Sequence, residues 1–162
     1  MHNKIHILVV LIISLVSCDE THVFDEYQTT SNGWKIDQPA TFTMTPPDTL
    51  NTYNLFINLR STNSFPYSNL FLITKMQFPH GKVITDTLEY RMAFPNGEWM
   101  GEGFSDVKEN KLWYKEGIIF SEDGEYTLEI FQAMRENGTV EGDEILAGIT
   151  EVGFRIEKPK TR

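Results

Sequence analysis

Cysteine is almost absent from this sequence, because the 162 residues contain only Cys18. A single cysteine cannot form an intramolecular disulfide and cannot supply the several thiolates of a structural zinc site. Histidine is also scarce. His22 and His80, the two that follow Cys18, do not form the HxxxH or HExxH spacing of a metal site. The sequence therefore predicts no disulfide framework and no metal centre.

Motifs that carry catalysis or hold a cofactor are missing as well. We find no G-x-S-x-G nucleophile elbow, no P-loop and no dinucleotide-binding fingerprint. Basic residues are outnumbered, with 14 Lys and Arg against 23 Asp and Glu, a formal net charge of −9. Nucleic-acid binding requires a cationic footprint, so that class is not expected, and neither is electrostatic attraction to anionic lipid. These absences favour a non-enzymatic protein without a cofactor.

Long hydrophobic runs are limited to the N-terminus. The apolar segment 7–16 has ten residues, too short for the roughly 20 that a permanent transmembrane helix needs. It ends in Leu15-Val16-Ser17-Cys18, and polar sequence follows at once. This pattern predicts a cleaved lipoprotein signal peptide over residues 1–17, with Cys18 becoming the lipid-bearing first residue. The alternative is an ordinary signal peptide with a free Cys18 thiol, which is a liability in an oxidising compartment.

The remaining chain is rich in β-strand signals. Period-two alternation, bounded by Pro, Gly and Asn, predicts strands over 40–44, 52–60, 70–78, 82–94, 112–121, 126–134 and 145–156, after an irregular strand near 23–27. Turn signals recur about every ten residues, as in sandwiches and barrels. We therefore expect an all-β protein, a single antiparallel, jelly-roll-like β-sandwich of about eight strands. The expected segments are a lipid-anchored tether with the first irregular strand (18–38), the sandwich (39–158) and a frayed tail (159–162).

Alternation is cleanest over 52–60. One face carries Tyr53, Leu55, Ile57 and Leu59, and the other carries Asn54, Phe56, Asn58 and Arg60. Phe56 is the exception on an otherwise polar face. It is expected to make an edge contact or to belong to a binding surface.

Residues 96–111 are the least regular part of the domain and are predicted to form a shaped loop. Three glycines surround Trp99, and glycine permits backbone angles closed to other residues. The residues considered for partner or ligand binding in or beside loops are Tyr67, Trp99, Trp113, Glu98 and Glu102. Loop aromatics more often plug the ends of a sandwich, and loop acids are more often solvated than catalytic or calcium-binding.

Several ordered segments together resemble the gliding motility lipoprotein GldH family. They are Cys18-Asp19, 67–70, 86–88, 97–103, 124–126, 132–135 and 148–156. The resemblance covers nearly the whole mature chain and implies no reaction. Of its functional residues, only Cys18 transfers.

What the resemblance implies is an acylated envelope lipoprotein of gliding Gram-negative bacteria. Its diacylglyceryl and acyl (palmitate-type) chains on Cys18 would anchor it, in the outer membrane rather than the inner, with the domain exposed to the periplasm. Its implied role is to support assembly or stability of the gliding motility and type IX secretion machinery, with other gliding or secretion lipoproteins as partners.

Two alternatives stay open from the residues. Trp99 among Glu98 and Glu102 suits an envelope carbohydrate- or peptidoglycan-binding module. Separately, Thr49 and Thr87 each lie in an Asp-Thr-Leu triplet that resembles an O-glycosylation site.

Overall fold

The computed structural model describes residues 22–103 and 105–160, and every element in this range is a strand. The strands are β1 (His22–Thr29), β2 (Trp34–Lys35), β3 (Ala40–Met44), β4 (Tyr53–Thr62), β5 (Asn69–Gln77), β6 (Val83–Arg91), β7 (Val107–Ile118), β8 (Tyr126–Gln132), β9 (Ile145–Leu146) and β10 (Ile149–Glu157). The predicted signal peptide and Cys18 lie outside the described residues.

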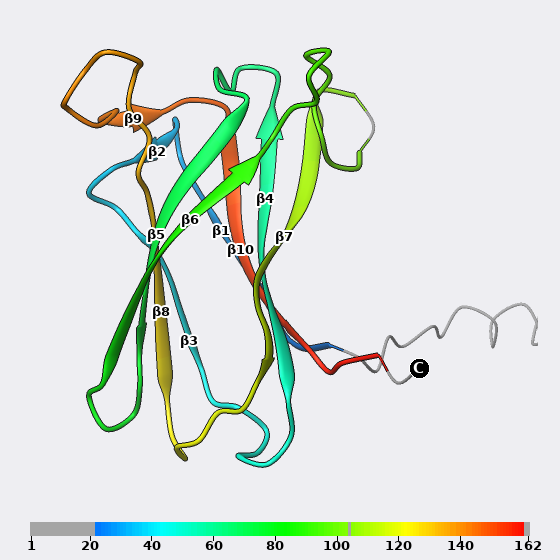
Figure 1. Ribbon diagram of the computed structural model, residues 1–162, viewed down its shortest axis with the longest axis vertical. Coiled ribbons are helices and arrows are strands. Elements are labelled where there is room, and N and C mark those ends of the chain that lie inside the picture. Colours follow the sequence, from blue (N-terminus) through cyan, green and yellow to red (C-terminus); the bar gives the residue numbers. More distant parts are fainter. Residues whose placement is uncertain (1–21, 104, 161–162) are drawn as a thin grey trace, which may run out of the picture.

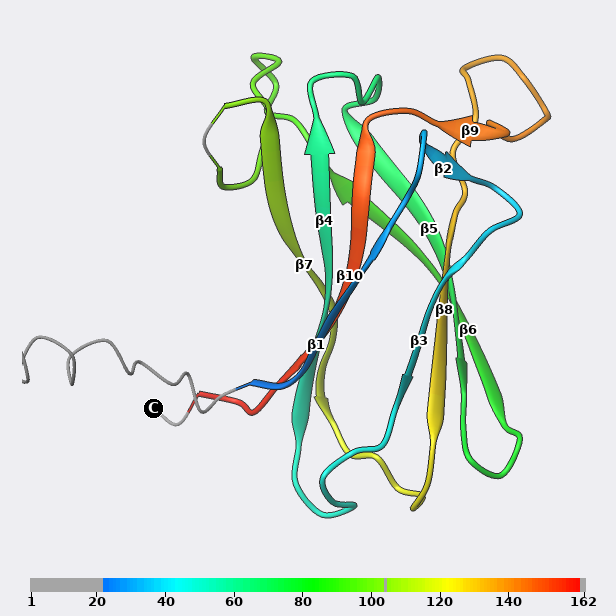
Figure 2. The same cartoon turned by 180° about the vertical axis from the view of Figure 1, so that it is seen from behind.

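Two four-stranded sheets pack face to face, as Figures 1 and 2 show from opposite sides. The first sheet has the order β1-β10-β4-β7 and the second has the order β3-β8-β5-β6. All pairs are antiparallel, and β2 and β9 form a small ribbon at one end. Consecutive long strands lie in different sheets, except for the β5–β6 hairpin, and these two strand orders are those of a jelly roll, where two Greek keys build a double sheet. The predicted all-β antiparallel sandwich is confirmed.

Three strand boundaries differ from the sequence-based prediction. The structure places β1 in the first sheet, paired with β10 from His22 to Thr29, whereas the sandwich was predicted to begin at residue 39. Residues 107–111, predicted as loop, are the first residues of β7 and pair with β4. The last predicted strand is divided into β9 and β10, because Gly148 adopts a φ of 79° between them. In the first two cases pairing with a distant strand decided the local conformation, which local pattern does not report.

The core lies between the two sheets and follows the alternation of the strands. Leu55, Ile57 and Leu59 of β4 are fully buried, as predicted for that face. They meet the inward residues of the other sheet, such as Leu128 and Ile130 of β8. Across residues 22–103 and 105–160, no helix has the length and apolar character needed to span a membrane.

Candidate functional site

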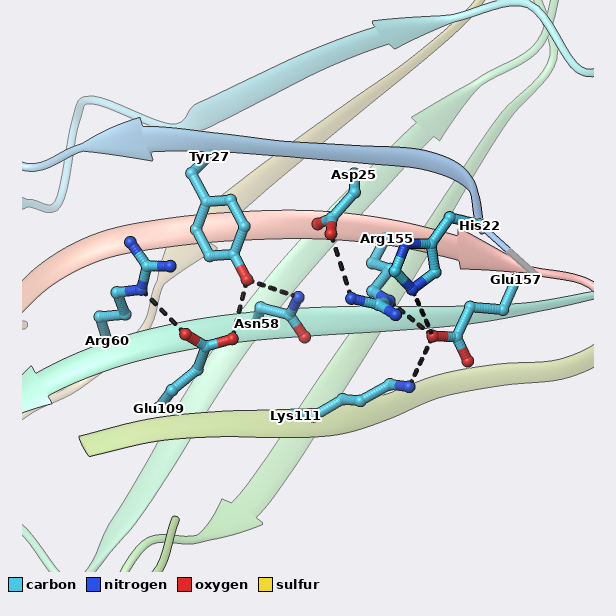
Figure 3. Close-up of polar contacts among 9 residues, drawn as sticks. All are labelled: His22, Asp25, Tyr27, Asn58, Arg60, Glu109, Lys111, Arg155 and Glu157. Atoms are coloured by element: carbon cyan, nitrogen blue, oxygen red, sulfur yellow. Dashed lines mark hydrogen bonds and ion pairs between the residues drawn. The ribbon is translucent and has the colours of Figure 1, made fainter. Parts of the chain in front are cut away.

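The outer face of the first sheet carries a continuous set of polar and charged side chains from all four of its strands. Figure 3 shows these side chains, apart from Glu151, and how they point toward one another across the sheet. We call this set the outer-face network; it comprises His22, Asp25, Tyr27, Asn58, Arg60, Glu109, Lys111, Glu151, Arg155 and Glu157. It exists because the period of two places every second residue of each strand on this face.

Arg60 is the centre of one half of the network. Its Nε lies 2.9 Å from Glu109 Oε2, and its Nη1 lies 2.6 Å from Glu151 Oε2. The guanidinium also sits 4.5 Å from the centroid of the Tyr27 ring. Arg60 therefore joins β4 to both of its neighbours, β7 and β10, through charge-assisted hydrogen bonds, which are among the stronger kind.

Tyr27 connects this half to the edge strand β1. Its hydroxyl donates to Glu109 Oε1 (2.9 Å) and accepts from Asn58 Nδ2 (2.9 Å). Burial, with the neighbouring Glu109 carboxylate, raises the pKa of Tyr27 to about 12. Burial works to raise the pKa of Glu109 too, but hydrogen bonds from Arg60 and Tyr27 outweigh it, so this pKa is lowered. Tyr27 therefore keeps its proton and Glu109 stays ionised, as the hydrogen bond from the hydroxyl to the carboxylate requires.

Glu157 is the centre of the other half. Its Oε1 lies 2.8 Å from Lys111 Nζ and 2.5 Å from Arg155 Nε. Arg155 in turn reaches Asp25 of β1 with its Nη1, at 3.1 Å. Burial would raise the pKa of Glu157, but the hydrogen bonds from Lys111 and Arg155 outweigh it and lower the pKa. A nearly buried carboxylate is stable here because it has two cationic partners.

An aromatic pair on β4 and β7 borders the network. The rings of Phe56 and Trp113 lie 4.5 Å apart, and Lys111 Nζ lies 4.0 Å from the Phe56 centroid. Trp113 remains 54% exposed, whereas Phe56 beneath it is only 4% exposed. Tyr90 of β6 fixes this part of β7 by donating its hydroxyl to the Trp113 carbonyl at 2.7 Å. The sequence predicted that Phe56 would make an edge contact or belong to a binding surface. In the structure Phe56 is covered, and the ring exposed at this contact is that of Trp113.

The five predicted partner or ligand residues do not form one site. Tyr67 and Trp99 both pack against Phe65, at ring distances of 6.1 and 5.9 Å, and both are half-buried at the end of the sandwich. Glu98 and Glu102 are exposed on the loop before β7. Trp113 lies instead within β7, on the outer face of the first sheet.

A groove on the second sheet contains one of these five residues. It has a volume of about 840 Å³, and its lining consists of Tyr67, Asn69, Phe71, Thr87 and residues 133–139. The Tyr67 hydroxyl donates to Asp143 Oδ2 at its rim. Of the two threonines in Asp-Thr-Leu triplets, Thr87 is exposed in this groove and Thr49 is half-buried in the loop after β3.

Sequence reasoning missed the outer-face network for a physical reason. The alternation of 52–60 already placed Asn58 and Arg60 on one face. However, their partners Tyr27 and Glu109 are 31 and 49 residues away in the chain. Only strand order brings such residues together, and strand order is not a local property.

The comparisons with known proteins agree with one another. The family model described as GldH lipoprotein matches residues 22–156. The protein is 54% identical to the "Gliding motility lipoprotein GldH homolog" of Christiangramia forsetii over 155 residues, covering 96% of this chain and 95% of that one. It is 49% identical to the "Gliding motility lipoprotein GldH" of Flavobacterium johnsoniae over 152 residues, covering 94% of each.

Among solved structures, the likeness is weak. The VP2 subviral particle of infectious bursal disease virus aligns over 87% of this chain with a TM-score of 0.39 and 14% identity. The chain spans only 34% of that viral protein, and a similarity of this size has no bearing on function. The family match over most of the described residues and the two relatives at near full length are decisive: this chain belongs to the GldH lipoprotein family.

Proposed function

We propose that the protein is a non-enzymatic lipoprotein, anchored in the outer membrane by lipid on Cys18, that supports assembly or stability of the gliding motility and type IX secretion machinery. Its domain would face the periplasm and contact other lipoproteins of that machinery. Two relatives named for gliding motility support the process. The position of Cys18, four residues before β1, supports the anchor.

The observation that carries the partner-binding role is the exposed Trp113 ring over a buried Phe56. A tryptophan that is fixed from below loses little conformational freedom when a partner covers it, and tryptophan is enriched at the energetic centres of interfaces. The charges around it are already paired within the chain, so a partner covering this face need not desolvate an isolated charge. The outer face of the first sheet is therefore the best-suited docking surface.

The anchor is tested by replacing Cys18 with Ala. The Cys18→Ala protein should lose incorporation of a labelled fatty acid and move from the membrane fraction to the soluble periplasmic fraction. A matched Ser17→Ala variant, which keeps both the cysteine and a small residue before it, should stay in the membrane. If Cys18→Ala remained membrane-bound, lipid on Cys18 would not be the anchor.

The docking surface is tested by photo-crosslinking in cells. A photoreactive residue at position 113 should give a discrete crosslink to another membrane lipoprotein. The same probe at Glu98, on an exposed loop at the far end of β7, should not. Crosslinks from position 98 alone would move the partner surface to the loop that sequence reasoning favoured.

A second function, binding of an envelope carbohydrate or peptidoglycan, is favoured by the groove on the second sheet. Phe71 and Tyr67 offer ring faces there, and Asn69, Asn137 and Thr87 offer hydrogen-bonding groups. Purified protein should then bind peptidoglycan fragments saturably, and Phe71→Ala should lose that binding. Loss in Trp99→Ala instead would locate the ligand at the loop before β7. Absence of saturable binding would eliminate this function.

A further inference from the structure

The short tether between Cys18 and β1 restricts which part of the domain can reach the membrane. Cys18 and His22 are separated by four residue steps, and a fully extended chain spans at most about 3.6 Å per residue. The start of β1 therefore lies within about 14 Å of the lipid-bearing cysteine. This restriction rests on the lipid anchor of the proposed function.

Both ends of the described chain leave the sandwich together. His22 pairs with Glu157 at the end of β10, and Figures 1 and 2 agree in showing the two ends side by side. Glu157 is opposite Asn54 of β4. The residues that follow β10 border the loop before β4, around a shallow hollow lined by Asn51, Thr52, Lys158, Pro159 and Lys160. This region is the part of the described domain that lies beside the anchor.

The loop before β4 presents an apolar side chain here in a fixed conformation. Asp48 Oδ1 accepts hydrogen bonds from the backbone N–H of Leu50 and of Asn51, at 2.9 and 2.7 Å, and Oδ2 accepts from the Tyr53 hydroxyl at 2.7 Å. Leu50 is nonetheless 85% exposed. Ile119, half-exposed, follows Ile118, which pairs with Tyr53. Two apolar side chains therefore project near the anchor from adjoining segments.

The segment that follows β10 carries positive charge, opposite in sign to the net charge of the chain. Lys158 and Lys160 are exposed. Two carboxylates of this region are engaged by the protein itself: Asp48 by its own loop, and Glu157 by Lys111 and Arg155. The net charge of the chain predicts no overall attraction to anionic lipid, but these two exposed lysines, grouped beside the anchor, suit the phosphates of lipid headgroups.

We propose that Leu50, Ile119, Lys158 and Lys160, the anchor-proximal patch, rest on the bilayer that carries the Cys18 lipid. Leu50 and Ile119 enter the boundary between headgroups and acyl chains, and the two lysines contact lipid phosphates. The opposite end of the sandwich, with the loop that contains Val140, then points away from the membrane. The patch orients the domain rather than holding it, because the lipid chains supply the affinity.

The test uses the full lipidated protein in vesicles of phosphatidylethanolamine with a minor fraction of phosphatidylglycerol. A spin label is attached to Leu50→Cys or, as the control, to Val140→Cys, which is 92% exposed in the loop after β8. Both side chains are exposed, so neither substitution disturbs the core. The label at position 50 should show a several-fold higher ratio of oxygen to nickel-chelate accessibility than the label at 140. Charge reversal of Lys158 and Lys160 should reduce this difference.

Each other outcome overturns the inference, and in a distinguishable way. Protein that binds the vesicles while both labels stay water-like keeps the anchor and refutes the patch. Protein that fails to bind the vesicles refutes the anchor and the patch together. A label at position 50 that is water-like in vesicles but immobilised in native membranes would show that a protein, and not lipid, covers the patch.

Discussion

Two carboxylates on the outer face of the first sheet show how single residues depend on distant partners. Glu109 and Glu157 both keep lowered pKa values although burial alone would raise them, because Arg60, Tyr27, Lys111 and Arg155 donate to them. Removing one partner of a buried pair costs more than the pair itself contributes, since the remaining charge is left without compensation. Substitution of Glu157, which is nearly buried, should therefore be more costly than its position on the outer face suggests.

Glu157→Gln should destabilise the protein by about 2 kcal/mol at pH 7, the range for hydrogen bonds to charged groups. The folded pKa lies below the ordinary value of 4.5, so the stabilisation is present above pH 4.5 and is lost as the pH falls through the folded pKa. Urea unfolding of wild type and variant from pH 7 to pH 3 should show the difference shrinking with acidity. The exposed Glu98→Gln should match wild type throughout. A difference that persisted at pH 3 would assign the effect to shape and not to charge.

Phe56→Ala should cost about 3 kcal/mol, as for a core phenylalanine, although Phe56 faces away from the core. Its ring is covered by Trp113 and Lys111, so truncation opens a void beneath both. Phe94→Ala, which removes a half-exposed ring, should cost clearly less, about 1 kcal/mol or below. If urea denaturation gave the same loss of unfolding free energy for both variants, Trp113 and Lys111 would not be packed over Phe56 as in the structure.

At the scale of the strands, two glycines of the C-terminal region allow close approaches between neighbouring segments. Gly153 of β10 faces the ring of Tyr27, where an added Cβ would lie 2.8 Å from two ring carbons. Gly148 turns the chain into β10, and an added Cβ would lie 2.1 Å from the backbone nitrogen of Phe65. These two contacts fix β10 against β1 on one side and against the β4–β5 connection on the other.

Gly148→Ala should destabilise the protein by well over the roughly 1 kcal/mol of an ordinary glycine substitution, because its steric clash is with backbone and cannot relax by a rotamer change. Gly138→Ala is the matched control. Its φ is also positive, at 92°, but nothing lies within 4 Å of an added Cβ. Thermal unfolding of the two variants thus separates the clash from the backbone strain. Equal melting temperatures would argue against the close packing at Gly148.

At the scale of the whole molecule, the first and last long strands of the described chain are neighbours in one sheet. β1 is the edge strand that pairs along the length of β10, and β10 in turn pairs with β4. Without β1, the backbone groups along one side of β10 would lose their hydrogen bonds, and Phe154 would lose its contact with the ring of Phe24. β1 is therefore part of the sandwich, and we expect the folding unit to include this segment, which the sequence assigned to a tether.

A chain that begins at residue 39 should fail to fold cooperatively, whereas one that begins at residue 22 should fold. Circular dichroism and urea unfolding of the two chains would measure this directly. A cooperative transition for the shorter chain would restore the domain boundary expected from the sequence.

In cells, deletion of the whole protein should abolish surface spreading and type IX secretion together. Loss of spreading alone would separate it from the secretion machinery.

The sequence by itself determined the class of fold and most of the strand positions. Period-two alternation and turn residues are local properties, so β3, β4, β5 and β8 lie where alternation predicted them, within about two residues. The same alternation determined which face of β4 enters the core. It also placed Phe56 correctly on the other face, without showing what covers it.

Only the tertiary structure decided the strand order, the assignment of β1 to the first sheet and the partners of Arg60, Glu109 and Glu157. Each of these depends on contacts between residues far apart in the chain, such as Tyr27 with Glu109, 82 positions apart. The aromatic residues considered for binding lie in different places for the same reason. β7 carries Trp113 onto the outer face of the first sheet, while Tyr67 and Trp99 pack against Phe65 at the end of the sandwich. Local pattern gives each residue a face, and long-range pairing decides what it meets there.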